Sequence, residues 1–410
     1  MRLSTLSLTD FRSYADAEVT LHRGPNVLLG FNGVGKTNIA EAIAYLSTLS
    51  SHRVPHDAPL VRHGQNQAII RVQAHRGPQD AMLDVEINPG RGNRVRINRG
   101  NPVRASEALG ILRTVLFAPE DLELIKGSPS VRRRLFDDLA VQLRPALART
   151  RLDYEKVLRQ RNALLKSIRR EGFTATHEST LTVWDQQLAE AGSRLLQARL
   201  QVLSALRPHV EQAYQEISGS VRTARLEYQS SVTESSQPGV PQAYGHDLES
   251  MDRLEIAERL RESLQRARRE ERERAQTLVG PHRDEILMSL DQVPVKGFAS
   301  HGETWSFALA LRLAAYRAMI DDDPAEGSRP ILILDDVFAE LDARRRARLA
   351  ELVSEAEQLI VTAAVDEDVP ESLMRHAYRV ESVDQLSSIT AHPHSTSRTS
   401  VDGDPDEAVS

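Results

Sequence analysis

The sequence predicts an α/β fold in which one sheet is interrupted by an inserted α-helical arm, on the basis of two observations. Short apolar strands alternate with helices at both ends of the 410-residue chain, and this alternation is typical of a mostly parallel sheet. Between the two ends the apolar period changes from two residues to between three and four, which is the period of helices. Because the α/β pattern resumes after the helices, the simplest topology inserts the arm into a single sheet.

Residues 1–118 are expected to form the first part of the α/β domain. The strands RLSTLSL, AEVTL and NVLLG precede the helix NIAEAIAYL. From about Leu83 to Val103, Gly, Asn and Pro separate short alternating runs, which predicts an antiparallel meander. A last short strand is expected near Phe117.

Residues 119–277 are expected to form the helical arm. Ser128 and Pro129 are a plausible N-cap and first helical residue, and a second helix should run from Pro145 to about Arg170. Apolar residues between 181 and 205 are spaced alternately by three and four, which predicts the seam of a left-handed helix pair. A third helix, DRLEIAERLRESLQRARREERERAQ, follows a loop rich in Ser, Pro and Gly.

Residues 278–387 are expected to complete the α/β domain. Strands are predicted at DEILMSL, VPVKGFA, ILILD and QLIVT, with a helix from about Glu303 to Ile320. Residues 388–410 contain too few large apolar side chains to pack, so a disordered acidic tail is expected there.

The charge distribution allows a nucleic-acid partner, and the composition excludes several kinds of chemical site. From Asp366 onward there are ten acids and three bases, so the other residues carry 49 of the 52 bases and 48 of the 58 acids. Such a near-neutral body can still present a basic face to nucleic acid. The absence of cysteine excludes disulfides, thiol nucleophiles and Cys-based zinc sites. Without an apparent secretory signal or spanning segment, a cytoplasmic protein is expected.

The segment GFNGVGKT matches the phosphate-loop pattern G-x-x-x-x-G-K-[ST]. It follows an apolar strand and opens a helix, which is the context that the pattern requires. Backbone N–H groups and the helix N-terminus favour phosphate, Lys36 can reach the β and γ oxygens, and Thr37 can ligate Mg²⁺. The predicted nucleotide-binding residues are Gly30, Phe31, Asn32, Gly33, Val34, Gly35, Lys36 and Thr37.

Two further segments predict nucleotide chemistry. Asp335 and Asp336 follow a buried strand at its carboxyl end, where ligands of open α/β sheets lie. Asp335 is placed to hold Mg²⁺, directly or through water, and Asp336 to polarise the attacking water. With Lys36 they form the predicted catalytic set. Ser300 and Gly302 begin an apolar helix and offer a second anion site, which makes sense if it serves a nucleotide held by another subunit.

Taken in order, GFNGVGKT, SHGE, ILILDD and ELD resemble an ABC-type P-loop ATPase head. FRSY, LFAPEDLELIKGSPSVRRRLFDD and GPHRDEI resemble in particular the RecF family, whose heads are SMC-like, and the resemblance covers nearly all of residues 1–370. It implies an ABC-type head with a coiled-coil-like arm that binds ATP and Mg²⁺. It also assigns Ser300, Gly302 and Glu303 to the signature presented to the opposite subunit, and Asp342 to the loop after the Asp335–Asp336 pair.

The resemblance further implies a homodimer, closed by ATP, that binds single-stranded DNA, duplex DNA and gap junctions. Slow DNA-dependent hydrolysis of ATP to ADP and phosphate would release it. The implied roles are DNA replication, recombinational gap repair, loading of recombination factors and induction of the SOS response. The mediator proteins RecO and RecR are the implied partners, and no membrane contact is implied.

Some residues depart from the transporter version of the ABC head or allow two interpretations. Thr362 stands where transporters usually place a histidine, and the segment FAPE, which contains Glu120, replaces the glutamine loop. Both residues are candidate sensors of the γ-phosphate. Arg12 could approach the phosphates or could be a surface arginine in a turn, and a structural role is favoured for His282 and His301.

DNA contacts are expected to be mainly electrostatic, because only 4% of the residues are aromatic. Two basic clusters are candidates, although charge clusters are more often solvated surfaces than binding sites. The first comprises Arg91, Arg94, Arg96, Arg99 and Arg104, and the second comprises Arg132, Arg133 and Arg134.

Two other functions remain to be weighed. The ATP-binding subunit of a membrane transporter would need an integral membrane partner, and the helical insert speaks against it. A non-catalytic scaffold would show negligible hydrolysis even with DNA present, and the insert is too short for a long-armed tether.

Overall fold

The computed structural model describes residues 1–232 and 246–392, which divide into two compact units. Unit 1 comprises residues 1–45, 50–105 and those from 330 onward, and unit 2 comprises residues 46–49 and 106–329. Most of the expected disordered tail, residues 393–410, lies outside the described residues. The expected start of the tail at residue 388 is wrong, because strand β15 (Leu386–Ala391) continues beyond Ser387 and pairs with β14.

One sheet of unit 1 is antiparallel, with the strand order β2-β1-β4-β5-β6-β7. Its inward residues, such as Leu83, Val85 and Val95, are fully buried, whereas the alternate residues are half-buried or exposed. The predicted meander is confirmed by β5, β6 and β7. The strands are β1 (Arg2–Phe11), β2 (Tyr14–Thr20), β4 (Ala68–Arg76), β5 (Gln79–Ile87), β6 (Arg94–Ile97) and β7 (Val103–Arg104).

A second sheet of unit 1 carries the predicted nucleotide segments. Its strands in this unit follow the order β15-β14-β3-β13-β12, and all neighbours except β15 and β14 are parallel. Every residue of β12 and β13 is buried, as expected for central parallel strands. The elements are β3 (Gly24–Leu29), β12 (Ile331–Asp335), β13 (Gln358–Ala363), β14 (His376–Val383), α1 (Lys36–Thr48) and α9 (Ala343–Val353).

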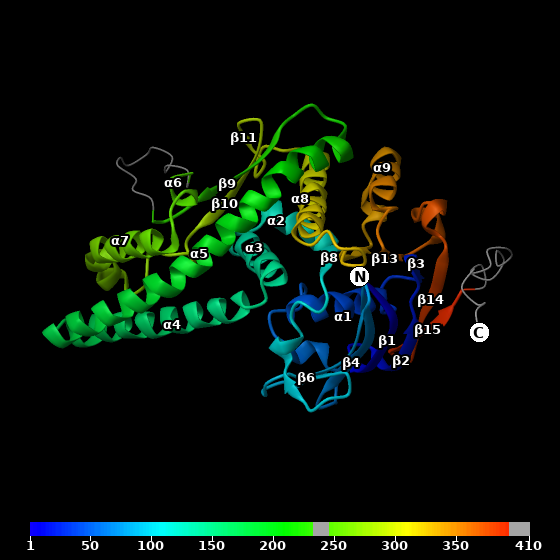
Figure 1. Ribbon diagram of the computed structural model, residues 1–410, viewed down its shortest axis with the longest axis horizontal. Helices are drawn as coiled ribbons and strands as arrows, with labels where there is room; N and C mark the ends of the chain where they lie inside the picture. Colours follow the sequence, from blue (N-terminus) through cyan, green and yellow to red (C-terminus); the bar gives the residue numbers. More distant parts are fainter. Residues whose placement is uncertain (233–245, 393–410) are drawn as a thin grey trace. The chain divides into compact units, whose positions relative to one another are not determined.

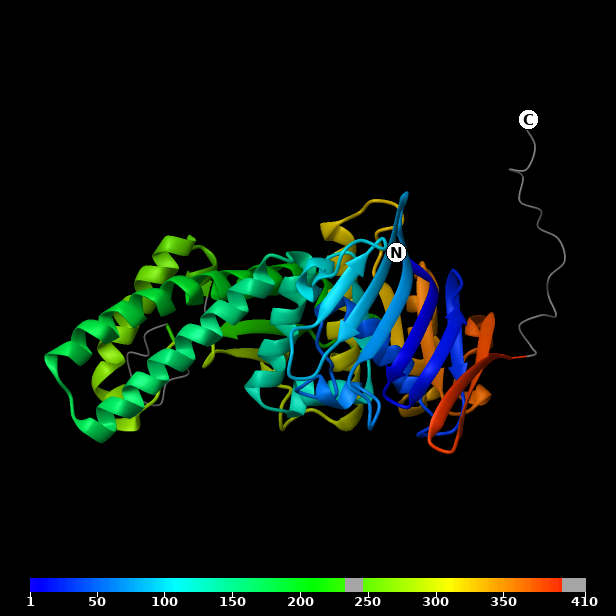
Figure 2. The ribbon, with the colours of Figure 1, turned by 90° about the horizontal axis from the view of Figure 1, so that it is seen from below.

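Unit 2 contains the predicted arm helices, and in Figures 1 and 2 the long helices α4 and α5 run side by side. Gly192 on α5 faces a crowded position, since an added Cβ would lie 3.2 Å from Tyr154 and 3.3 Å from Leu260. The helices are α2 (Leu122–Lys126), α3 (Pro129–Leu143), α4 (Leu147–Glu171), α5 (Ala175–Ser218), α6 (His246–Glu249), α7 (Arg253–Arg274) and α8 (His301–Asp322).

Unit 2 also has the short strand β8 (Thr114–Phe117) and a small antiparallel sheet, β11-β10-β9. β9 (Ala224–Gln229) was not predicted, and β10 (Glu285–Leu290) confirms DEILMSL. Of the expected strand VPVKGFA, only β11 (Val293–Pro294) forms, and the prediction is wrong for the rest. The chain turns at Gly297, which has φ +85°.

The chain divides differently from the expected boundaries, because residues 278–329 belong to the helical unit. The cause is α8, which packs along α5. An ion pair between Arg317 and Glu216, and a contact of 2.9 Å between His209 Nε2 and Asp321 Oδ2, join the same two helices. The helix that carries the expected signature is therefore part of the arm unit by its contacts.

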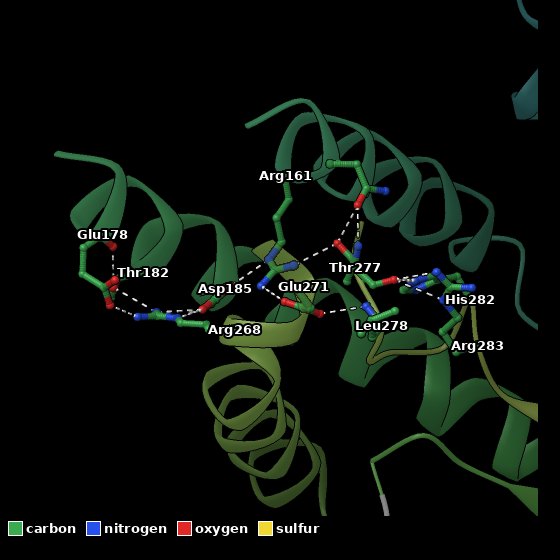
Figure 3. A network of polar contacts seen from close by, with 11 residues as sticks. Arg161, Glu178, Thr182, Asp185, Arg268, Glu271, Thr277, Leu278, His282 and Arg283 are labelled. Atoms are coloured by element: carbon green, nitrogen blue, oxygen red, sulfur yellow. Dashed lines mark hydrogen bonds and ion pairs between the residues drawn. The ribbon is translucent and has the colours of Figure 1, made fainter. Parts of the chain in front are cut away.

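A buried polar network joins α4, α5 and α7 (Figure 3). The Arg161 guanidinium is fully buried and donates to Asp185 Oδ1 at 2.7 Å, Glu271 Oε2 at 2.6 Å and Thr277 Oγ1 at 2.9 Å. Arg268 pairs with the second oxygen of Asp185. Every buried charge in the network has a partner, and a displaced helix would leave one of these charges unpaired. The network therefore fixes the relative positions of the three helices.

We expect Arg161→Met to lower the free energy of unfolding by about 3–5 kcal/mol, because Glu271 would remain as a buried carboxylate without its partner. Urea unfolding followed by circular dichroism measures this. Arg149→Met is the matched control, since Arg149 lies on the same helix with its side chain 88% exposed, and its effect should stay within about 0.5 kcal/mol. A loss for Arg161→Met no larger than that of the control would contradict this role of the network.

Candidate nucleotide site

The parallel sheet of unit 1 brings the predicted phosphate loop and the two aspartates together. Strand β13 lies between β3 and β12, with Thr362 paired to Leu28 on one side and to Asp335 on the other. The N–H of Gly30 donates to Ala363 O at 3.3 Å. Three chain segments far apart in sequence therefore end at one edge of the sheet, which is where ligands of parallel sheets bind.

The phosphate loop is closed around the Lys36 ammonium. Its Nζ donates to Gly30 O at 2.7 Å and to Phe31 O at 3.0 Å, and the side chain is only 5% exposed. Burial lowers the pKa of Lys36, while Asp336 and Asp335 act in the opposite direction. The ammonium thus lies near both carboxylates, bound to loop carbonyl oxygens that phosphate oxygens could replace.

The loop needs glycine where other segments cross it. Gly35 has φ +114°, and an added Cβ would lie 2.5 Å from Ser387 Oγ and 3.0 Å from Ser13 Oγ. The Ser387 hydroxyl donates to Val34 O at 2.6 Å, and the Tyr14 hydroxyl donates to Gly35 O at 3.1 Å. Ser387 was not predicted from the sequence, since it comes from β15 and belongs to no motif, and Ser13 and Tyr14 lie in the FRSY segment, for which no contact with the loop was predicted.

Asp335 is held by two hydroxyl groups. Its Oδ1 accepts from Thr37 Oγ1 at 3.0 Å and from Thr362 Oγ1 at 2.6 Å. The Thr362 hydroxyl also accepts from Asp336 N at 2.9 Å. Because this hydroxyl already donates and accepts, Thr362 orients the aspartate pair and has no proton left for a γ-phosphate.

Asp336 combines a left-handed backbone conformation with a buried side-chain oxygen. It adopts φ +57°, a conformation that is uncommon for a residue with a side chain. Its Oδ1 is buried, with no hydrogen-bond partner among the described residues. A buried carboxylate oxygen without a partner is costly, so it marks a place where a water or ligand donor belongs.

The residues at this edge fit Mg²⁺, which prefers oxygen ligands and usually keeps waters and substrate phosphates around it. The Thr37 hydroxyl and the Asp335 carboxylate supply two such oxygens. Within residues 1–232 and 246–392, no group of three or more His, Asp or Glu side chains could hold a metal by itself. The arrangement therefore suits an ion shared with a phosphate ligand.

A cavity of about 830 Å³ lies beside the phosphate loop. Its lining combines the turn after β1, the start of α1, residues 58–65 and the β14–β15 turn. It was not predicted from the sequence, since no single segment forms it. The lining residues include Ser13, Asn38, Pro59, Val61, His63 and Leu386.

Arg12 has a structural partner. Its guanidinium donates to both oxygens of Glu41 at 2.8 and 2.6 Å and to Pro59 O at 2.9 Å. Burial raises the pKa of Glu41, but hydrogen bonds from Arg12 and Ser51 outweigh it and leave the pKa lowered. Arg12 is thus held by Glu41 and Pro59 with its side chain 15% exposed, which corrects the interpretation as a surface arginine, and it also lines the cavity beside the loop.

The expected signature segment is described within unit 2 alone. Ser300 is the N-cap of α8, and its Oγ accepts from Glu303 N at 3.3 Å. In return, Ser300 N donates to Glu303 Oε2. Ser300 is exposed and Gly302 is half-buried. Asp342 likewise caps α9 in unit 1, accepting from Arg345 N at 2.9 Å.

The two basic clusters differ. Arg132 is buried and donates to both oxygens of Glu285, to Leu124 O and to Gly127 O. It is therefore unsuited to hold a phosphate, and Arg133 and Arg134 also have protein partners, Asp284 O and Asp138. All five arginines of the first cluster are exposed, although Arg96 pairs with Glu86 of the adjacent strand.

The remaining candidates lie in unit 2. Glu120 is exposed. His282 joins the buried network, where its Nδ1 lies 2.7 Å from the Tyr154 hydroxyl oxygen and burial lowers its pKa to about 4. This confirms the structural interpretation of His282. His301 is exposed at the start of α8.

In the described part of the chain, no helix is both long and apolar enough to cross a membrane.

Comparisons with known proteins show the family to which the chain belongs. The family model for the RecF/RecN/SMC N-terminal domain matches residues 2–388. A DNA replication and repair protein RecF from Arthrobacter sp. (strain FB24) is 52% identical over 391 residues, which cover 93% of this chain and 97% of the relative. RecF from Streptomyces avermitilis is 51% identical over 383 residues, covering 93% and 98%.

Solved structures show the same fold. The structure of the recombination mediator protein RecF-ATPrS in the RecFOR pathway has a TM-score of 0.81 and 27% identity, covering 95% of this chain and 98% of that one. The Smc head bound to the C-winged helix domain of ScpA has a TM-score of 0.53 at 18% identity, which supports the fold alone. The fold is thus α/β, of the ABC-type head that RecF and SMC proteins share. Since the family model and relatives above 50% identity span nearly the whole chain, the chain belongs to the RecF family.

Proposed function

We propose that this chain is an ATP-dependent DNA-binding protein of DNA replication and recombinational gap repair, which hydrolyses ATP slowly when DNA is bound. Relatives that align over nearly their full length are named DNA replication and repair proteins, and a RecF-ATP structure aligns with a TM-score of 0.80. These names favour a repair function over the transporter alternative. The proposal includes RecO and RecR as partners, a part in SOS induction and a cytoplasmic location.

The unit 1 site supports ATP binding and hydrolysis. The N–H groups of residues 33–36 and the Lys36 ammonium would hold phosphate oxygens. Thr37 and Asp335 would hold Mg²⁺, which bridges phosphate oxygens and neutralises developing charge. Asp336 would accept a hydrogen bond from the attacking water. The cavity beside the loop has a volume suited to the nucleoside part of the substrate.

The observation that carries the proposal is the Asp336 oxygen, which has no partner within residues 1–232 and 246–392 and lies at the edge that also holds Lys36, Thr37 and Asp335. Its decisive test is the ATPase rate and the sedimentation coefficient, each measured with and without single-stranded, duplex and gapped DNA. We expect slow turnover that rises with DNA and a dimer that needs ATP. A chain that neither binds nor hydrolyses ATP under any of these conditions would contradict the proposal.

The composite site is the second element of the proposal. One phosphate loop serves one nucleotide, yet α8 offers a further N-terminus capped by Ser300. We infer that the signature of one copy, Ser300 with Gly302 and Glu303, completes the nucleotide site of another copy. The closed dimer would then hold DNA, and hydrolysis would release it.

The exposed arginines at the β6–β7 edge are the proposed DNA contacts. Arg94 and Arg104 lie opposite each other on neighbouring strands, and both are exposed. We expect Arg94→Ala with Arg104→Ala to weaken binding of any duplex sequence. The slope of log K against log[salt] should become shallower by about 0.9 for each phosphate that the protein no longer neutralises.

Fluorescence anisotropy at several salt concentrations measures this change in slope. Arg169→Ala is the control, since Arg169 is exposed at the end of α4, in the other unit. An unchanged slope in the double variant would remove this edge from the DNA interface.

A further inference from the structure

The N-terminus of α8 already holds a carboxylate of its own chain. Ser300 N and Ser300 Oγ each donate to Glu303 Oε2 at 2.9 Å. These two groups are the donors that Ser300 has to offer to an incoming anion. Hydrogen bonds from Ser300, followed by Arg222, lower the pKa of Glu303, so the carboxylate stays ionised at neutral pH.

The other oxygen of this carboxylate is bound from outside the helix. Arg222 Nη1 donates to Glu303 Oε1 at 2.7 Å. Arg222 lies between the end of α5 and the start of β9, after the left-handed Gly219 at the end of α5. Arg222 therefore links the segment that follows α5 to the first turn of α8.

Arg222 is anchored independently of Glu303. Its Nε donates to Asp291 Oδ2 at 3.0 Å and its Nη2 donates to Leu290 O at 3.1 Å. Asp291 is itself held by Thr223 N, which donates to Asp291 Oδ1 at 3.0 Å. The guanidinium can therefore keep its position while the Glu303 side chain rotates.

This arrangement conflicts with the expectation that Glu303 contacts the nucleotide. If Ser300 is to donate to a phosphate of another copy, the same N–H and O–H cannot remain fully bound to Glu303. Two anions at one helix N-terminus also repel each other. Glu303 must then leave Ser300, and Arg222 is the cation beside it that can receive the carboxylate.

We propose that Arg222 is a positioning residue, which draws the Glu303 carboxylate away from Ser300 when a phosphate from a second copy arrives. The inference rests on the proposed composite site and deepens it. Glu303 then competes with the phosphate, and Arg222 reduces that competition. Because Arg222 and α8 belong to the same compact unit, this change needs only a rotation of the Glu303 side chain.

The test compares dimer dissociation constants by sedimentation with ATP, in chains that also carry Asp336→Asn so that the nucleotide persists. We expect Glu303→Gln to tighten the dimer by about threefold or more, because the neutral amide competes less. Arg222→Met should weaken it by about tenfold, and Arg222→Lys should weaken it less, since the charge remains. In Arg222→Met with Glu303→Gln, most of the Arg222 effect should disappear.

Glu216→Gln is the matched control, because Glu216 pairs with Arg317 of α8 and its side chain is 29% exposed, as is that of Glu303. It should leave the constant within about twofold. Loss of structure cannot explain opposite signs for Glu303→Gln and Arg222→Met, and thermal unfolding checks that each variant folds.

The outcomes separate the inference from the proposed function on which it rests. A looser dimer in Glu303→Gln, or no effect of either variant on a parent that dimerises, overturns this inference alone. A parent chain that stays monomeric at saturating ATP overturns the composite site together with the inference.

Discussion

Lys36→Met is expected to abolish ATP binding, with a loss of affinity of at least about 100-fold, which is about 2.7 kcal/mol. The ammonium lies inside the phosphate loop on two carbonyl oxygens, next to both aspartates. Met has a similar length but carries no charge, so the loop would retain its shape and lose its cation. Without nucleotide, the ATP-dependent dimer should not form.

Titration calorimetry with ATP and sedimentation with and without ATP measure the two losses. Lys296→Met is the matched control, because Lys296 also donates to a backbone carbonyl, Gly127 O, at 2.8 Å, but lies outside this site. Thermal unfolding checks that Lys36→Met folds, because removal of the ammonium leaves Asp335 and Asp336 without their neighbouring positive charge. ATP affinity within threefold of the parent chain would show that Lys36 does not hold phosphate.

Asp336→Asn is expected to preserve ATP binding and to slow hydrolysis by about 10²-fold or more, since the charged acceptor for the attacking water is lost. Asn is nearly isosteric and tolerates the left-handed backbone that Asp336 adopts at φ +57°. The unpartnered Oδ1 position would still be filled, but by an amide group. Dimers formed with ATP should therefore persist.

A phosphate-release assay with DNA and a time course of sedimentation after ATP addition measure these effects. Asp84→Asn is the control, because the Asp84 carboxylate pairs with Arg71 in the antiparallel sheet of unit 1 and neither residue lines the cavity beside the loop. Its turnover should stay within about threefold of the parent rate. Turnover at the parent rate in Asp336→Asn would remove this residue from its proposed role.

The parts of the site that are contiguous in sequence could be predicted from the sequence. The phosphate loop must follow a strand and open a helix, so β3, the loop and α1 are specified together. Four apolar residues followed by two aspartates likewise specify the end of β12. Strong local periodicity also predicted the helices α3, α4, α5, α7 and α8, and DEILMSL predicted β10.

Expectations based on composition alone were less reliable. VPVKGFA has strand-forming residues, but it turns at Gly297 and pairs only at Val293–Pro294. The five arginines between residues 91 and 104 have no acid among them in sequence, yet Glu86 on the adjacent strand pairs with Arg96. Arg132 stands in a basic run, but an ion pair with Glu285 buries it. For both arginines, a residue distant in sequence decides the outcome.

The sequence by itself determined the phosphate loop, the aspartate pair and the helical character of the arm, because each depends on contacts within a few residues. Only the tertiary structure decided which groups are free to act. It committed the Thr362 hydroxyl to Asp335 and the Arg12 guanidinium to Glu41. It also left one oxygen of Asp336 without a partner among the described residues. The physical reason is that a hydrogen bond is decided by which side chains the fold brings within about 3 Å, and sequence spacing does not encode that distance.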